Sequence, residues 1–178
     1  MKKILSLALV MLLMLSALCI ASADTLSDIQ DKSVLVVGAN IEFPPYEFYW
    51  TNPETGEEEL AGFDIDLARG IAEELAVELQ VNDQAFSGLV TALSVSEMDV
   101  VISGLAIKPE RLEVVDFSDS YFAGEQILLI RSEAADTYKT DADLKGKRVG
   151  AQLGSLQRYT YHFGNWMSTA RWVPAAST

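Results

Sequence analysis

The stretch SVLVVGA, residues 33–39, and the stretch DVVIS, residues 99–103, decide the fold of this chain. Both are short runs rich in β-branched residues, which predicts buried strands. A further brief strand is predicted at residues 79–81. Helical segments separate these strands, and that alternation is typical of βαβ units in a mostly parallel sheet. The sequence therefore predicts an α/β fold.

Two helices are predicted between the strands. The first follows Gly62, and we expect Asp64 to cap its N-terminus. The second begins near Ser87. Apolar residues at helical spacing indicate the faces that pack against the sheet. These are Ala68, Ile71, Ala72, Leu75 and Leu79 in the first helix, and Leu89, Val90 and Leu93 in the second.

Between the first strand and the first helix, the pattern predicts a hairpin. Residues 46–49 and 58–61 pair around the sequence NPETG at 52–56, whose residues favour turns.

The second half of the chain continues the alternation. The apolar run QILLIR, residues 126–131, predicts another strand, and residues 140–144 predict a short helix that ends at Gly146. Residues 148–152 predict a strand that leads into the turn Gly154-Ser155, where a second βα unit begins.

Ligands of parallel sheets bind beyond the carboxyl ends of the strands. The segments that leave those ends are 40–46, 83–88 and 104–111. Arg111 follows a proline that favours the first turn of a helix, and its planar guanidinium can bind a carboxylate bidentately. The alternative is a surface arginine paired with Glu110 or Glu113.

Phe43 and Phe86 lie in two different strand-end loops, from which aromatic rings can flank a ligand. Packing in the core is the alternative for both. Tyr46 and Tyr121 are predicted to lie in the core or at the rim of the site.

The N-terminus has the order of a secretory signal peptide. Two lysines precede the apolar run 4–20, which ends in Ala-Ser-Ala at 21–23. We expect residues 1–23 to be cleaved and the protein to be exported; a membrane anchor is the alternative. Lipid attachment sites resemble a motif with glycine or alanine immediately before the cysteine, whereas Leu18 precedes Cys19. We therefore expect Cys19 to belong to the discarded signal peptide; a lipid anchor is the alternative. The mature chain then has no thiol.

The composition excludes several classes of function. The formal net charge is −13, with no basic stripe for phosphate backbones, so we expect no nucleic-acid partner. The single histidine, His162, lies in residues 158–178, a stretch without acidic residues that holds two of the three tryptophans. This stretch resembles a frame-disrupted tail; a genuine C-terminal tail is the alternative. We expect no metal and no cofactor.

Seven motifs, taken together, resemble the family 3 solute-binding proteins, which deliver polar amino acids to ABC importers. The resemblance covers residues 34–157 and rests on VGAN (37–40), FPPYEF (43–48), GFDIDLARGIAEEL (62–75), AFSGLVTAL (85–93), DVVISGLAIKPER (99–111), VVDFSDSYF (114–122) and DLKGKRVGAQLGS (143–155). Each motif is weak on its own, but their order is specific.

The resemblance implies a periplasmic-binding-protein-like α/β fold. Its first lobe, residues 24–125, has a mostly parallel sheet with helices on both faces. Residues 126–131 form a hinge-crossing strand, and residues 132–157 begin a second α/β lobe. The family's second hinge strand and its returning helices have no counterpart in this chain, so we expect a truncated or frame-disrupted copy.

The resemblance also implies the ligand site. Arg111 binds the α-carboxylate, and Phe43 and Phe86 flank the ligand. The backbone of Gly104 and Ala106 completes the first side, and Gln152 and Ser155 face it from the second lobe. Asn40 stands where the family commonly has an acidic residue, Ala106 where it has a hydroxyl, and Leu156 where threonine or serine is common.

The implied protein is a monomeric, non-catalytic binding component in the periplasm or at the extracytoplasmic face of the membrane. Its ligand is a polar amino acid, and its partner is the membrane permease of an ABC transporter. The alternatives are a periplasmic dehydratase or lytic transglycosylase domain on the same fold, the sensor domain of a receptor, and a non-functional fragment.

Overall fold

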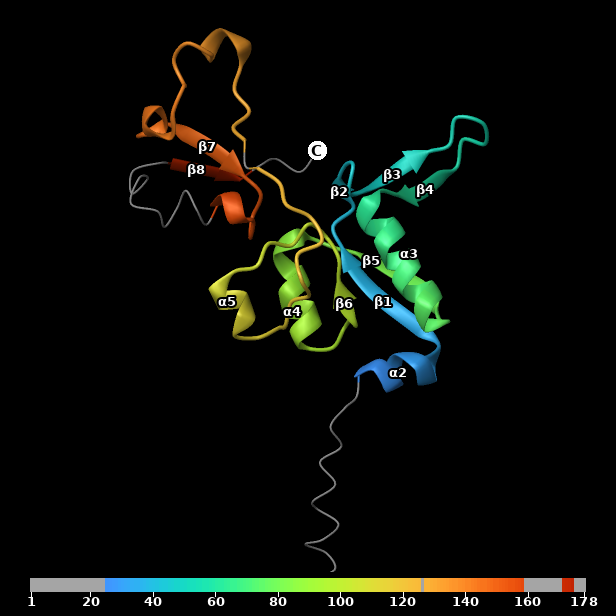
Figure 1. Ribbon diagram of the computed structural model, residues 1–178. Helices are drawn as coiled ribbons and strands as arrows, with labels where there is room; N and C mark the ends of the chain where they lie inside the picture. Colours follow the sequence, from blue (N-terminus) through green and yellow to red (C-terminus); the bar gives the residue numbers. More distant parts are fainter. Residues whose placement is uncertain (1–24, 126, 159–170, 175–178) are drawn as a thin grey trace, which may run out of the picture.

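The computed structural model describes residues 25–125, 127–158 and 171–174 (Figure 1). The expected signal peptide, Cys19 and His162 lie outside the described residues, as does most of the tail from 158 onward. Below, the first part of the chain means residues 25–125, and the second part means the described residues after 126.

A three-stranded parallel sheet forms the centre of the first part. Its order is β5-β1-β6, with β1 at Val34–Ala39, β5 at Glu78–Asp83 and β6 at Val100–Val101. The strands predicted at 33–39 and 79–81 are confirmed. The strand predicted at 99–103 is shorter, although bonds from Asp99 N to Val36 O and from Ile102 N to Gly38 O extend its pairing with β1.

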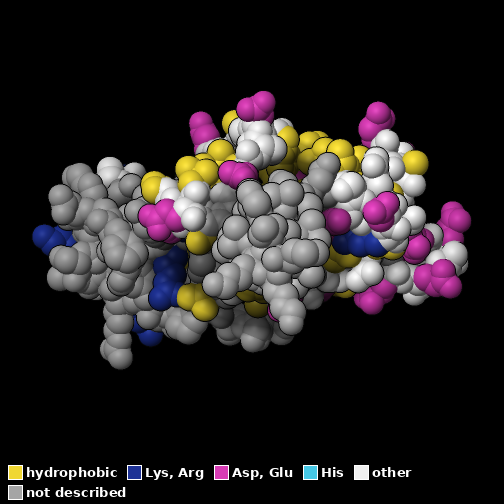
Figure 2. Space-filling view, turned by 90° about the horizontal axis from the view of Figure 1, so that it is seen from below, with side chains coloured by type: hydrophobic (Ala, Val, Ile, Leu, Met, Phe, Trp, Pro, Cys, Tyr) yellow, Lys and Arg dark blue, Asp and Glu magenta, His cyan; other side chains and the backbone are white. Residues whose placement is uncertain are grey.

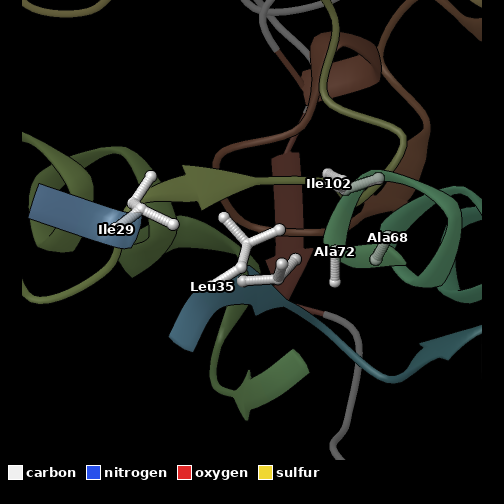
Figure 3. Close-up of a cluster of buried hydrophobic side chains, with 6 residues drawn as sticks. Ile29, Leu35, Ala68, Ala72 and Ile102 are labelled. Carbon is white, nitrogen blue, oxygen red and sulfur yellow. The ribbon is translucent and has the colours of Figure 1, made fainter. Parts of the chain in front are cut away.

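Helices cover both faces of this sheet, as predicted. Helix α3, Phe63–Leu75, packs on the face where Leu35 lies, and Figure 3 shows Ala68 and Ala72 of α3 beside Leu35 and Ile102. Successive residues of a strand point to opposite faces. Gly38 therefore belongs to the other face, where a Cβ would meet Leu89 of helix α4, Leu89–Ser94, at 3.3 Å. A 3₁₀ turn, η1 at Phe86–Gly88, leads into α4.

The start and the end of α3 differ from the prediction. Gly62, with φ 123°, occupies the N-cap, and the first helical N–H groups bind the carbonyls of Pro45 and Tyr46 at 3.1 and 2.9 Å. Backbone carbonyls thus take the place of a capping side chain, so the prediction that Asp64 caps the helix is wrong. Asp64 is buried instead. Leu79 lies in β5 and not on the helix stripe, because α3 ends before it.

The hairpin is confirmed. Strands β3, Glu47–Thr51, and β4, Glu58–Ala61, pair antiparallel, and β2, Glu42–Phe43, adds a third strand on the other side of β3. The side chain of Asn52 accepts a bond from Glu54 N at 2.9 Å, which is the asparagine turn geometry that the sequence favoured.

A helix that the sequence analysis did not assign, α2 at Thr25–Lys32, precedes the sheet. Its Ile29 joins the core of the first part, as Figure 3 shows. Its Lys32 pairs with Asp99 at 2.6 Å. The helix is thereby fixed to the loop that precedes β6.

The second part contains two 3₁₀ turns, η2 at Ser132–Ala134 and η3 at Asp141–Leu144, and one small sheet. The helix predicted at 140–144 is present as η3, with a capping box between Thr140 and Asp143. Backbone N–H groups of Thr140 and Lys139 lower the pKa of the Asp143 carboxyl. The strand predicted at 148–152 is confirmed as β7, Arg148–Ala151, which pairs in parallel with β8, Arg171–Pro174.

The strand predicted at 126–131 is wrong for its described residues, 127–131, which form no strand. Ile127 is 83% exposed and Leu129 is 98% exposed. A strand requires a neighbour for its backbone hydrogen bonds, and within the described part of the chain no strand lies beside this run. The apolar composition of this run is therefore not sufficient to predict a strand.

The described surface is acidic, as the net charge of −13 requires. On the face in Figure 2, acidic side chains are spread over the described parts and basic ones are fewer. Among the described helices, none has both the length and the apolar character needed to cross a membrane. The described residues also contain no group of three His, Cys, Asp or Glu side chains placed to hold a metal.

Candidate functional site

A cavity of about 700 Å³ lies beyond the carboxyl ends of β1 and β6, between the first and second parts of the chain. Each of the three segments that the sequence singled out contributes to its wall, and so does the turn after β7. All eight predicted site residues line it: Asn40, Phe43, Phe86, Gly104, Ala106, Arg111, Gln152 and Ser155.

Arg111 is the buried cation of the cavity. It lies on the short helix α5, Pro109–Leu112, with proline in the first turn as predicted. Its side chain is only 8% exposed and donates to the carbonyls of Ala106 and, at 3.1 Å, Gly154. The guanidinium carbon lies 5.8 Å from the centre of the Phe86 ring. Burial lowers the pKa of Arg111, but a guanidinium keeps its charge in proteins.

The alternative of a surface arginine paired with Glu110 or Glu113 is wrong. Arg111 is buried and donates to two backbone carbonyls, and none of the ion pairs found in the described residues joins it to either glutamate. A cation held by carbonyl oxygens keeps its full charge toward the cavity, whereas a carboxylate partner would neutralise it.

The two phenylalanines flank the cavity in different ways. Phe43 is 51% exposed, so it is not a core residue. Its ring stacks on Tyr46 with 5.0 Å between centroids, and it covers Gly104, where a Cβ would lie 3.3 Å from the ring. Phe86 packs against the guanidinium of Arg111. Both rings therefore present aromatic surface at the cavity wall.

Residues of the second part close the cavity from the opposite side. Gln152 Nε2 donates to Asn40 Oδ1 at 2.8 Å, across 112 residues of sequence. Ser155 is buried, and its carbonyl accepts a bond from Lys108 Nζ at 3.1 Å. Both residues therefore contact the first part of the chain directly.

The two predicted backbone positions are engaged within the protein. Gly104 donates its N–H to Asp64 Oδ2 at 2.8 Å, and Ala106 accepts the Arg111 bond with its carbonyl. Gly104 has φ 53°, a conformation that glycine adopts without strain.

The sequence analysis missed the burial of two carboxyls, that of Glu47, which lines the cavity, and that of Asp64. Glu47 and Asp64 are each 1% exposed. Ser103 Oγ donates to Glu47 Oε1 at 2.6 Å, and Tyr121 donates its hydroxyl to Asp64 Oδ2 at 3.1 Å. The second oxygens, Glu47 Oε2 and Asp64 Oδ1, accept no hydrogen bond from the described residues. Two such oxygens pair when one carboxyl carries a proton.

The electrostatics place that proton on this pair at neutral pH. Burial, reinforced by the charge of Asp64 and opposed by the Ser103 hydrogen bond, raises the pKa of Glu47 to about 8. Burial and the nearby Asp64 also raise the pKa of Tyr121, so its hydroxyl remains a donor. The only signal in the sequence is that a charged residue, Glu47, begins a strand that continues as FYWT. A single charged residue of this kind does not indicate whether its side chain is buried.

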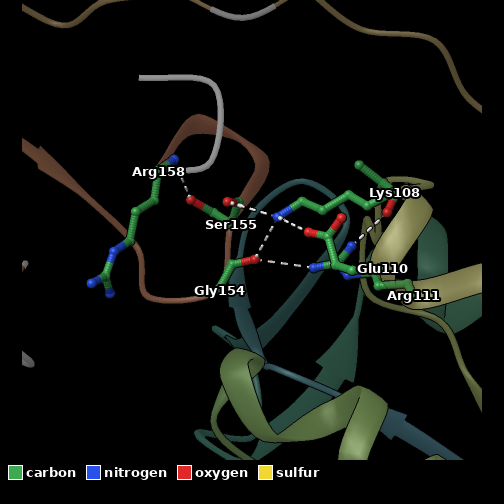
Figure 4. Close-up of polar contacts among 7 residues, drawn as sticks. Lys108, Glu110, Arg111, Gly154, Ser155 and Arg158 are labelled. Carbon is green, nitrogen blue, oxygen red and sulfur yellow. Dashed lines mark hydrogen bonds and ion pairs between the residues drawn. The ribbon is translucent and has the colours of Figure 1, made fainter. Parts of the chain in front are cut away.

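Lys108 was also missed by the sequence analysis. It is 5% exposed, lies three residues before Arg111, and contacts the turn at 154–155 (Figure 4). Burial and the charge of Arg111 lower its pKa. Lys108 does not itself line the cavity, but it is a second buried cation near Arg111 and contacts the turn that does.

Comparison with known proteins adds family information to this geometry. The model of the bacterial extracellular solute-binding proteins, family 3, matches residues 35–162. The arginine-binding extracellular protein ArtP of Bacillus subtilis (strain 168) is 35% identical over 152 residues, covering 82% of this chain and 56% of ArtP. The chain spans about half the length of the curated relatives it matches.

Two solved structures have the same fold. The arginine-bound form of truncated ArgBP from T. maritima is 36% identical with a TM-score of 0.74, covering 84% of this chain and 66% of that one. The ancestral amino-acid-binding protein AncCDT-1, a precursor of cyclohexadienyl dehydratase, is 33% identical with a TM-score of 0.72, covering 84% and 65%. All three proteins are named as binding proteins, in agreement with the expectation of a binder and not an enzyme.

Proposed function

Because the chain belongs to the bacterial extracellular solute-binding proteins of family 3, we propose that it binds a free amino acid in the cavity between its two parts, as the substrate-binding component of an ABC importer. Arg111 binds the α-carboxylate of the ligand. Phe43 and Phe86 flank the ligand, and Asn40, Gly104, Ala106, Gln152 and Ser155 complete the wall.

The buried charge of Arg111 is the observation that carries this proposal. A guanidinium has five N–H donors, and the contacts to Ala106 and Gly154 occupy two of them. The remaining donors match the two oxygens of a carboxylate in a planar fork. Each charge-assisted bond contributes on the order of 1.5–3 kcal/mol, which is sufficient to select an organic acid.

Arginine is the ligand that the observations favour. ArtP and ArgBP are named for arginine binding. Asp116, Asp119 and Glu125 also line the cavity. These carboxylates favour a ligand that carries a cationic side chain in addition to its carboxylate.

The proposal extends to organisation and location. Residues 24–125 are assigned to the first lobe, 126–131 to its connection with the second, and 132–157 to the start of the second lobe. Of the tail predicted at 158–178, the described residues 171–174 pair with β7 as strand β8. The family description supports an extracytoplasmic site of action, where the protein delivers its ligand to a membrane permease as a monomer.

Calorimetric titration of the full chain with L-arginine and with agmatine tests this function. Agmatine is arginine without its carboxylate, so the pair isolates the contact assigned to Arg111. We expect saturable binding of L-arginine and binding of agmatine weaker by at least about 100-fold, as the loss of two charge-assisted bonds predicts. Equal affinities for the two would contradict carboxylate binding, and absence of binding for every common amino acid would contradict the function.

Replacement of Phe43 by alanine is expected to weaken L-arginine binding by about tenfold or less, because an aromatic contact contributes ~0.5–1.5 kcal/mol beyond its buried area. Trp50→Ala is the matched control, since Trp50 is an exposed ring of the same three-stranded sheet that does not line the cavity. Equal losses of L-arginine affinity in the two variants would show that Phe43 does not contact the ligand.

A further inference from the structure

Lys108 occupies a position where its residue type is unexpected. It is the N-cap of α5, with φ −137° and ψ 146°, and its side chain makes no capping hydrogen bond there. N-cap positions favour serine, threonine, aspartate and asparagine, whose side chains bind the first N–H groups of the helix. A lysine contributes nothing of that kind to α5, so its role lies elsewhere.

The side chain of Lys108 reaches from the first part of the chain to the second. Its Nζ donates to the carbonyl of Gly154 at 3.2 Å and to that of Ser155 at 3.1 Å, and Glu110 Oε1 lies 4.0 Å away (Figure 4). The side chain is nearly as buried as a core residue. A buried ammonium is unfavourable unless it is hydrogen-bonded, so the two carbonyls determine where Lys108 lies.

The turn that Lys108 contacts forms one wall of the cavity. Gly154 has φ 83°, and a Cβ there would lie 3.1 Å from Ser87 Cα, so the turn packs closely on the segment before α4. The carbonyl of Gly154 accepts from both Lys108 Nζ and Arg111 Nη2. This turn is therefore bound to the first part by two cations through one shared oxygen.

We propose that Lys108 is a positioning residue that keeps the turn at 154–155 closed over Arg111. We call its two bonds to Gly154 and Ser155 the Lys108 bridge. A carboxylate that binds the remaining N–H donors of Arg111 leaves the Lys108 bridge intact. Together with the bond from Gln152 to Asn40, the bridge then holds the turn in place, so ligand binding does not open the wall of the site.

The bridge acts before the ligand arrives as well. A ligand that binds only the closed form has its apparent affinity reduced by the fraction of molecules that are open. By populating the closed form, Lys108 raises the affinity for the ligand without touching it. This consequence for affinity rests on the proposed function, whereas the bridge itself does not.

The test compares hydrogen–deuterium exchange of the ligand-free full chain in four forms: wild type, Lys108→Met, Lys108→Arg and Lys139→Met. Lys139 is an exposed lysine of the second part and serves as the control. We expect Lys108→Met to accelerate exchange in residues 152–158 by about tenfold. Other segments should stay unchanged, Lys108→Arg should restore slow exchange, and Lys139→Met should match wild type.

Calorimetry with L-arginine on the same proteins gives the second readout. We expect Lys108→Met to bind about tenfold more weakly and Lys108→Arg to recover most of that loss. Unchanged exchange at 152–158 in Lys108→Met overturns the proposal. If that variant does not fold, Lys108→Gln, which has a shorter side chain with an NH₂ donor group but no charge, replaces it and is judged by the same criterion.

The two proposals fail separately. If wild type binds no L-arginine but Lys108→Met still accelerates exchange at 152–158 alone, the bridge stands and the ligand assignment is wrong. If L-arginine binds tightly and Lys108→Met changes neither exchange nor affinity, the ligand assignment stands and the bridge is wrong.

Discussion

Replacement of Glu47 by glutamine is expected to abolish most of the dependence of stability on pH between about 5 and 8, the range over which Glu47 keeps its proton in the folded chain but has lost it in the unfolded chain. The substitution keeps the shape of the side chain. Its amide oxygen accepts from Ser103, and its NH₂ group donates to Asp64 Oδ1, which accepts no bond from the described residues of the wild type.

The direction of the effect follows from proton binding. Below the ordinary pKa of 4.5, folded and unfolded chains both carry the proton of Glu47; between 4.5 and about 8, only the folded chain does. Because the folded state then binds more protons, the free energy of unfolding decreases as the pH rises through this window. Each unit of pKa difference corresponds to about 1.36 kcal/mol, so the total change reaches several kcal/mol.

Urea denaturation at pH 5 and pH 8 measures this effect. We expect Glu47→Gln to match wild type within about 1 kcal/mol at pH 5 and to be more stable at pH 8. Glu42→Gln is the control, because Glu42 is an exposed residue of the neighbouring strand. Tyr121 donates its hydroxyl to Asp64, and its raised pKa keeps that donor protonated throughout. Parallel pH profiles for wild type and Glu47→Gln would show that the pair does not hold a proton.

Patterns local to one element were sufficient for most of the fold. The β-branched run at 34–39, the NPETG turn and the apolar stripe through Ala72 each report on a single strand, turn or helix. These signals depend on the period of side chains and on turn chemistry, and both are present in the sequence itself.

The features that failed depend on a distant partner. The run 127–131 has the composition of a strand but no neighbouring strand among the described residues. Asp64 has the residue type of a helix cap, but the carbonyls of Pro45 and Tyr46 already bind the first turn of α3. In both cases the local sequence permits a role that a segment far away in the chain decides.

The candidate site also has residues that local patterns predicted and residues whose contacts depend on distant segments. The eight residues named from the sequence all line one cavity, because strand ends of a parallel sheet meet at one edge and motif positions indicate which residues follow them. Glu47 and Lys108 were missed, since their contacts cross 56 and 47 residues of sequence to reach Ser103 and Ser155. The sequence around Glu47 and around Lys108 contains no local pattern that indicates whether the charged side chain is buried or exposed.

Removal of the guanidinium of Arg111 is expected to cause the largest loss of ligand affinity. In Arg111→Ala the α-carboxylate of L-arginine loses two charge-assisted bonds, so binding should weaken by at least about 100-fold. Arg111→Lys keeps a positive charge but not the planar fork, and we expect it to recover only part of this loss. The pair of variants separates the contribution of charge from that of bidentate geometry.

The fold should survive both substitutions, because the Gly154 carbonyl retains its bond from Lys108 when Arg111 is absent. Calorimetry with L-arginine measures affinity, and thermal denaturation confirms that each variant is folded. Arg131→Ala is the control, since Arg131 has an exposed side chain and pairs only with Glu133 among the described residues. A folded Arg111→Ala that binds L-arginine as tightly as wild type would show that the buried cation serves only to join the two parts of the chain, and that the ligand carboxylate binds elsewhere.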